Sequence, residues 1–254
     1  MAFVPVLRLD PDLAGEVPED RRALAMRSCL AEAVELPKGE WDGELAGHEP
    51  SGMGLLVLSG TLCRRVVQQE CYGAELLGPG DLLRPWDQVR QWTSIPTESS
   101  WTVFQPIQLA VLDAEFARRA SRWPEIGSHL LGRALMRSRY LAILVAIISQ
   151  RRIETRLTML FWHLADRFGQ MRGEWIEIPL PLTHSLLGEV VAARRPTVTT
   201  ALTHLQERGV LRRSGGGWCL ASTPPPALLE AREEMRAIAA GDYVPPEKVA
   251  SAPS

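Results

Sequence analysis

Hydrophobic and polar positions follow two different periods along the 254-residue chain, and these divide it into a strand-rich part and a helix-rich part. Acidic residues after Pro18 predict the start of a helix that runs from about Glu19 to Ala33. From Val34 to Asp113, short Leu- and Val-rich runs alternate with glycine and proline. This pattern predicts an antiparallel β-roll. The expected strands are Val34–Leu36, Gly54–Leu58, Leu62–Val67, Ala74–Leu77, Trp101–Phe104 and Gln108–Leu112.

A long helix is expected after the roll, beginning at Asp113, interrupted at Pro124 and continuing to Gln150. Its last part, 140–148, is apolar on every face, so it must be covered all round. A spacing of three and four residues, with Arg137 as an interruption, predicts a coiled-coil seam and hence a homodimer. The alternative is a central helix buried within one monomer. The predicted seam consists of Leu130, Ala134, Leu141, Leu144 and Ile148.

The C-terminal part reads as a winged helix-turn-helix between Leu180 and Leu220, preceded by an amphipathic helix, Ile153 to Phe168, and a short strand from Glu174. Thr183 can cap a first helix, and Pro196 suits the first turn of a second helix that stops at Gly209. Both helices have one apolar face, which favours packing at a steep angle. The inward residues are Leu186, Leu187, Val190 and Val191 in the first helix and Val198, Ala201, Leu202 and Leu205 in the second.

The outer face of the second helix carries short polar side chains and one arginine, which suit insertion into a major groove. The run from Val210 to Leu220, with glycines at its tip, predicts a two-stranded wing. A helical hairpin used for protein contact is the alternative. The predicted DNA-contacting residues are Thr183, His184, Arg194, Arg195, Thr197, Thr199, Thr200, His204, Arg212 and Arg213.

Charge is distributed unevenly, although the whole chain has a net charge of only −2. Residues 1–150 carry a net charge of −4, whereas residues 151–220 carry +4, as expected if only that segment approaches phosphates. A hydrophobic content of 46% is ordinary for a folded globular protein. No secretory signal or membrane-length apolar run is evident, so we expect a cytoplasmic protein without a membrane partner.

These patterns predict an α+β protein with four segments. They are an effector-binding-like β-roll domain over 1–130, a dimerisation helix over 131–150, a winged helix-turn-helix over 151–222, and a C-terminal helix with a tail over 223–254. The C-terminal helix is expected from Ala227 to Ala240.

Four motifs in this order resemble the Crp/Fnr superfamily of bacterial transcription regulators. They are Leu56-Val-Leu-Ser-Gly-Thr-Leu, Leu77-Gly-Pro-Gly-Asp, Leu109-Ala-Val-Leu-Asp and Arg195-Pro-Thr-Val-Thr-Thr-Ala-Leu. The resemblance covers nearly all of the chain from Glu19 to Leu220. It implies a cyclic-nucleotide-binding-like roll and a homodimer that binds a two-fold-related operator, with half-sites roughly 34 Å apart. RNA polymerase is a further partner that it implies.

The chain departs from the cyclic-nucleotide-binding members of that family. Arg84-Pro85 replaces the Gly-Glu pair that holds the ribose, and Thr97-Glu98-Ser99 aligns with the phosphate clamp, where Glu98 would repel a phosphate. Cyclic AMP binding in the usual mode is therefore not expected. A different small molecule could be held by Arg84, Trp86, Glu98, Ser99 and Leu141. The predicted winged helix-turn-helix, called the reader below, also lacks the family's acidic residue beside Arg195, so its operator should differ.

Two other functions have less support in the sequence. A cupin-like metal enzyme would need clustered ligands, but His48, His129, His163, His184 and His204 are dispersed. Haem or iron–sulfur sensing would have to use His48, or Cys63 with Cys71, and the four cysteines form no C-x-x-C pair. We therefore expect no catalysis, no metal and no cofactor.

Overall fold

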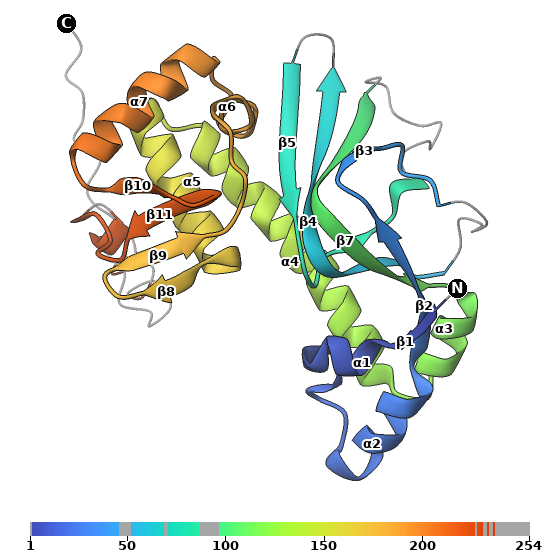
Figure 1. Cartoon of the computed structure of the whole chain (residues 1–254). Coiled ribbons are helices and arrows are strands. Elements are labelled where there is room, and N and C mark those ends of the chain that lie inside the picture. The colour runs from blue at the N-terminus through green and yellow to red at the C-terminus, as the bar shows by residue number, and fades with distance from the viewer. Residues whose placement is uncertain are drawn as a thin grey trace, which may run out of the picture.

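A computed structural model describes residues 2–45, 52–68, 71–86, 97–226, 228–230, 233 and 236 of the chain. Figure 1 shows a β-roll and a winged helix on either side of one long helix, α4 (Pro124–Ile148). His48 and most of the helix predicted over Ala227–Ala240 lie outside the described residues.

The roll is an antiparallel sheet in the order β1-β2-β7-β4-β5, with β3 paired to β7 and β6 paired to β4. Its strands are β1 (Ala2–Pro5), β2 (Leu30–Leu36), β3 (Gly39–Trp41), β4 (Gly54–Gln68), β5 (Cys71–Leu77), β6 (Leu82–Leu83) and β7 (Glu98–Leu112). Short helices gather at one end of the roll: α1 (Val6–Leu9), η1 (Pro11–Ala14), α2 (Glu19–Ser28) and α3 (Ala114–Ala120).

Two expectations about the roll are corrected. The first helix, α2, ends at Ser28, because the segment from Leu30 onward pairs with both β1 and β7. Strands predicted as separate pieces are continuous in β4 and β7, whose pairing shifts register between Val57 and Leu62. Gly60 makes the irregularity possible: its φ is 83°, and a Cβ there would lie 2.4 Å from the Pro106 carbonyl oxygen.

Helix α4 packs one side against the roll and leaves the other side exposed. Ile126 and Leu130 are buried among the N-terminal helices, and Ile147 is buried near the other end. Arg133 forms an ion pair with Asp10, and Arg137 forms one with Glu75 of β5. On the opposite side, Leu131, Leu135 and Val145 are 62%, 63% and 59% exposed.

The structure divides the predicted seam of α4: Ala134 and Leu141 are exposed, whereas the other three positions are at least partly covered by the same chain. Leu130 is only 2% exposed, and Leu144 packs against the core of its own chain. The exposed positions with alternating spacing lie one residue further along; we name them the outer stripe, which consists of Leu131, Leu135, Ser138, Ala142 and Val145. Periodicity could not separate the two registers because this part of the helix is apolar on every face.

The C-terminal module combines three helices with a small sheet in the order β10-β11-β9-β8. Helix α5 spans Ile153–Phe168, the bounds that the sequence predicted. The other elements are β8 (Gln170–Arg172), β9 (Trp175–Ile178), α6 (His184–Val191), α7 (Arg195–Glu207), β10 (Leu211–Ser214) and β11 (Gly217–Ala221). In the part of the chain that the structure describes, no helix is long and apolar enough to cross a membrane.

One hydrophobic core joins this module to the roll. Cys63, Ala74 and Leu76 of the β4–β5 hairpin belong to the same buried cluster as Leu160 and Leu164 of α5. Gly78, just after β5, lies so close to the Phe168 ring that a Cβ at position 78 would be 2.5 Å from it. The roll and the module thus meet through packed side chains.

Candidate nucleic-acid interface

A short turn connects α6 to α7, and three local features define its geometry. Thr183 caps α6, because its Oγ1 accepts a hydrogen bond from the Leu186 amide at 3.2 Å, as predicted. Ala192 ends the helix in the left-handed conformation, with φ 53°. A Cβ on Gly188 would lie 2.6 Å from the Ala193 carbonyl oxygen, so glycine allows the chain to turn closely there.

The buried face of α7 contains the four residues that the sequence predicted: Val198, Ala201, Leu202 and Leu205. They belong to one core with the inward residues of α6 and α5. The opposite face is exposed. Its exposed residues in the first three turns are Arg195, Pro196, Thr197, Thr199, Thr200, Thr203 and His204. Thr203 was missed by sequence reasoning, although its spacing of four from Thr199 places it on the same face.

His184 joins α6 to α7 through its side chain. Its Nδ1 lies 2.9 Å from Thr199 Oγ1, and its ring lies 6.1 Å from the Trp218 ring. Burial lowers the pKa of His184 below its ordinary value, and the positive charges of Arg213 and Arg195 lower it further. The imidazole is therefore neutral at pH 7 and supplies a fixed contact between the two helices.

Each of the two wing arginines lies over an aromatic ring. The Arg212 guanidinium lies 4.3 Å from the centre of the Trp175 ring, and that of Arg213 lies 4.1 Å from Trp218. Both arginines are exposed, and Gly215 has φ 52° at the turn between β10 and β11. Stacking holds the side chains in place while leaving guanidinium edges open to phosphate oxygens.

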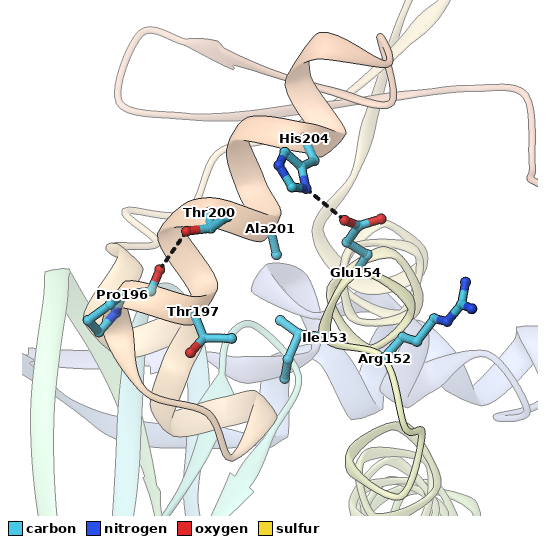
Figure 2. Close-up of a pocket in the computed structure, with 8 residues that line it drawn as sticks. All are labelled: Arg152, Ile153, Glu154, Pro196, Thr197, Thr200, Ala201 and His204. Atoms are coloured by element: carbon cyan, nitrogen blue, oxygen red, sulfur yellow. Dashed lines mark hydrogen bonds and ion pairs between the residues drawn. The ribbon is translucent and has the colours of Figure 1, made fainter.

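A groove separates α7 from the beginning of α5 (Figure 2). His204 Nδ1 lies 3.0 Å from the Glu154 carboxylate, which also accepts a hydrogen bond from Arg208 at 3.4 Å. His204 thus points toward α5 beside a carboxylate, a neighbour that could not be predicted from the sequence. Arg152 lines the same groove and, with Arg151, forms a short basic run directly before α5.

The five residues predicted to form an effector pocket do not come together. Arg84 is exposed and donates to the Gly52 carbonyl oxygen at one end of β4, with its guanidinium 5.8 Å from the Trp86 ring. Glu98 pairs with Val67 near the other end of that strand, and Ser99 follows it. Leu141 is 40% exposed on α4. These five residues therefore do not form a single site.

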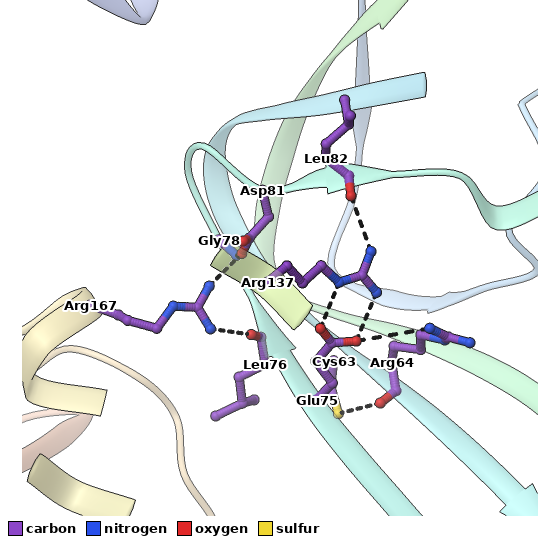
Figure 3. Close-up of polar contacts among 9 residues, drawn as sticks. All are labelled: Cys63, Arg64, Glu75, Leu76, Gly78, Asp81, Leu82, Arg137 and Arg167. Atoms are coloured by element: carbon purple, nitrogen blue, oxygen red, sulfur yellow. Dashed lines mark hydrogen bonds and ion pairs between the residues drawn. The ribbon is translucent and has the colours of Figure 1, made fainter. Parts of the chain in front are cut away.

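Buried ion pairs occupy the junction between roll, α4 and α5 instead (Figure 3). Arg137 binds both carboxylate oxygens of Glu75, at 2.6 and 2.8 Å, and also donates to the Leu82 carbonyl oxygen. Arg167 of α5 binds Asp81 at 2.6 Å and donates to the Leu76 carbonyl oxygen at 3.0 Å. Burial raises the pKa of Asp81, and the charge of Arg167 opposes this change.

Metal and haem ligation have little support among the described side chains. Burial raises the pKa of the Cys63 thiol to about 12, which keeps it protonated and disfavours its use as a thiolate ligand. Within the described ranges, no three His, Cys, Asp or Glu side chains gather around one point.

Comparisons with known proteins agree with this architecture. Residues 155–229 match the model of the Crp-like helix-turn-helix domain family. The regulatory protein CysR of Synechococcus elongatus is 32% identical over 142 residues, which are 54% of this chain and only 60% of that relative. The CRP-like cAMP-activated global transcriptional regulator of Mycobacterium tuberculosis is 26% identical over 199 residues, covering 76% of this chain and 85% of the relative.

The fold also matches a solved structure. A cyclic nucleotide-binding domain containing protein from Listeria monocytogenes EGD-e superposes with a TM-score of 0.63 at 17% identity, covering 85% of this chain and 98% of that one. The roll, the long helix and the winged helix-turn-helix thus occur in the expected order, with a matching reader at the C-terminal end. Residues 155–229 thus carry a Crp-like helix-turn-helix domain, and the chain as a whole is similar to transcription regulators of the Crp/Fnr type.

Proposed function

We propose that this chain is a DNA-binding transcription regulator that acts as a homodimer on a two-fold-related operator in the cytoplasm. The observation that carries the proposal is the outer face of α7, which is exposed, free of acidic residues over its first three turns, and begins with Arg195. Such a face on the second helix of a helix-turn-helix suits the major groove. The wing arginines beside it would meet the phosphate backbone.

The outer stripe of α4 supports the homodimer. Its three large apolar side chains, Leu131, Leu135 and Val145, are each more than half exposed in the single chain. Burying a side chain of this size stabilises an interface by about 1.5 to 3 kcal/mol, and a second copy of α4 offers a matching surface. A two-fold axis along this helix would present two α7 helices to successive major grooves, roughly 34 Å apart.

The proposal does not include binding of cyclic AMP in the usual mode. Arg84 and Glu98 lie near opposite ends of β4, so they cannot together replace a ribose and phosphate clamp. A non-nucleotide effector is the alternative. The junction between roll and reader would then be the route by which such a ligand acts on α5 and α6.

The test begins with selection of operators from randomised DNA duplexes by the full-length protein. We expect a two-fold-related sequence and a dimeric mass by analytical ultracentrifugation. Leu135→Glu should give a monomer and lower the affinity for the full operator about 100-fold, because the two half-sites are no longer linked. Leu24→Glu is the matched control, because Leu24 is an exposed leucine on α2, outside the outer stripe. It should leave the mass and the operator affinity unchanged.

The outcomes separate the parts of the proposal. Equal affinity for selected and random duplexes would contradict sequence-specific regulation. An unchanged mass for Leu135→Glu would contradict the outer stripe as the dimer surface. In the same binding measurement, addition of cyclic AMP should leave operator affinity unchanged, and a marked increase would contradict the loss of the nucleotide clamp.

A further inference from the structure

Four residues form the part of α7 that faces directly away from its buried side. They are Pro196, Thr199, Thr200 and Thr203, and we name them the reading strip. At 100° per residue they lie opposite Val198, Ala201, Leu202 and Leu205, and all four are exposed. The strip contains no charged side chain, so any base recognition along it must use methyl groups, ring carbons or hydroxyls.

The three hydroxyl groups of the strip already have hydrogen-bond acceptors within the helix. Thr199 Oγ1 donates to the Arg195 carbonyl oxygen at 3.0 Å, and Thr203 Oγ1 donates to the Thr199 carbonyl oxygen at 3.1 Å. Thr200 Oγ1 donates to the Pro196 carbonyl oxygen at 3.3 Å, as Figure 2 shows. Threonine hydroxyls in helices commonly form this bond to the residue four positions earlier. The single proton of each hydroxyl is therefore used internally.

Thr199 is the most fully satisfied of the three. Its Oγ1 also lies 2.9 Å from His184 Nδ1. With the Thr199 proton directed at the Arg195 carbonyl oxygen, the Nδ1-protonated tautomer of the neutral imidazole is the one that can donate to Thr199 and hold its rotamer from the side of α6. Turning this hydroxyl toward a base would break two hydrogen bonds at once.

The side-chain groups left for contact are the three threonine methyl groups, the pyrrolidine ring of Pro196, and the oxygens of Thr200 and Thr203, which can accept from an amino group but have no proton to donate. In the major groove, thymine presents a C5-methyl group, with which a threonine methyl makes an apolar contact. Guanine presents only acceptors there, and hydroxyls whose protons are already engaged have no donor for them. The geometry points to a reading strip that recognises pyrimidine C5-methyl groups, a proposal that rests on the DNA-binding function above.

The half-site should accordingly contain thymines next to the base pair contacted by Arg195. A C5-methyl group also occurs on 5-methylcytosine, so the shared chemistry is the methyl group and the two bases must be distinguished by experiment. Recognition through the methyl group predicts that both bases are accepted. Recognition through thymine O4 predicts that only thymine is accepted.

The experiment uses full-length protein and the selected operator. Each thymine of the half-site is replaced singly by deoxyuridine, which removes only the C5-methyl group. We expect about a fourfold loss of affinity at each position that touches the strip, the value of one buried methyl group. At the same positions, a 5-methylcytosine·guanine pair should bind more tightly than a cytosine·guanine pair.

Two matched variants assign the effect to Thr200. Thr200→Ser removes the methyl group and keeps the hydroxyl, so it should abolish the preference for thymine over deoxyuridine at one position. Thr200→Val keeps a methyl group and removes the hydroxyl, so it should retain that preference. The position is exposed, and unchanged thermal unfolding of both variants serves as the folding control.

Several results would overturn the proposal. Equal affinity for thymine and deoxyuridine duplexes at every position would exclude methyl readout, while selective binding of the operator would leave the regulator function intact. Loss of thymine preference in Thr200→Val but not in Thr200→Ser would assign recognition to the hydroxyl. If the wild-type protein selected no sequence at all, the proposed function would fail, and this proposal would fail with it.

Discussion

Charged side chains are arranged in opposite ways in the roll and in the winged helix-turn-helix. At the roll, carboxylates and arginines turn inward and neutralise one another. The three pairs are Asp10 with Arg133, Glu75 with Arg137, and Asp81 with Arg167. In the reader, Arg195, Arg212 and Arg213 are exposed and form no ion pair with the described part of the chain. The first arrangement holds the protein together, whereas the second leaves positive charge available to DNA.

This difference bears on how each part can bind a ligand. An anionic effector at the junction of roll and α4 would have to displace Glu75 from Arg137, leaving a buried carboxylate with only the more distant Arg64 as a counter-ion. A phosphate at the wing would displace only water from Arg212 and Arg213. Electrostatics therefore favours DNA at the reader and disfavours small anions at this junction.

The largest expected effect comes from breaking a pair on the roll side. Glu75→Gln removes the charge that neutralises Arg137, with Arg64 4.0 Å away as a second neighbour. We expect the free energy of unfolding to fall by about 3 kcal/mol, because a buried arginine loses its counter-ion. Urea unfolding followed by circular dichroism measures the change. Glu115→Gln, in an exposed pair with Arg118, is the matched control and should have no measurable effect.

A smaller effect, in binding, is expected on the reader side. Arg195→Ala should weaken binding to the specific operator by about 1 to 3 kcal/mol and relax the base preference at one position. Stability should not change, because the side chain is exposed. Fluorescence anisotropy with specific and random duplexes gives both affinities, and Arg122→Ala, at an exposed position near α3, is the control. Equal losses on both duplexes would mean that Arg195 contacts only phosphate.

The smallest expected effect is the pH dependence of stability that arises from His163 of α5. Burial lowers the pKa of His163, and the charge of Arg167 lowers it further, against the weaker influence of Asp166. Below about pH 6.5 the unfolded chain binds a proton that the folded chain does not, so stability should decrease as the pH falls from 7 to 5. His163→Gln should reduce this slope in urea unfolding measured at several pH values. Identical slopes in both proteins would contradict the assignment.

The reader could be predicted closely from the sequence because several local signals agree. A capping Thr183, an early Pro196 and apolar residues at helical spacing all place α6 and α7 where the structure has them. Helices that begin at these positions turn the apolar faces of both α6 and α7 toward one core. The hydrogen bonds of His184 and His204 could not be predicted, because their partners are brought close by the tertiary fold.

The roll and α4 were harder to predict, because the deciding partners are distant in sequence. Arg137 was read as an interruption of an apolar seam, yet it marks the inner face, since Glu75 on β5 neutralises it. Likewise, Leu30–Ala33 suits a helix or a strand until β1 and β7 are placed beside it. The expected effector residues were chosen by their places along the sequence, and strand pairing puts Arg84 and Glu98 near opposite ends of β4.

The continuous core between the β4–β5 hairpin and the reader limits how freely the two halves can be exchanged between regulators. Leu160 and Leu164 of α5 belong to the same buried cluster as Ala74 and Leu76 of the roll, so cutting the chain before α5 would expose apolar surface that is buried in the intact protein. A chimaera that joins this reader to a foreign roll would need to bring the β4–β5 hairpin with it. In this protein, the unit of exchange is larger than the unit of DNA recognition.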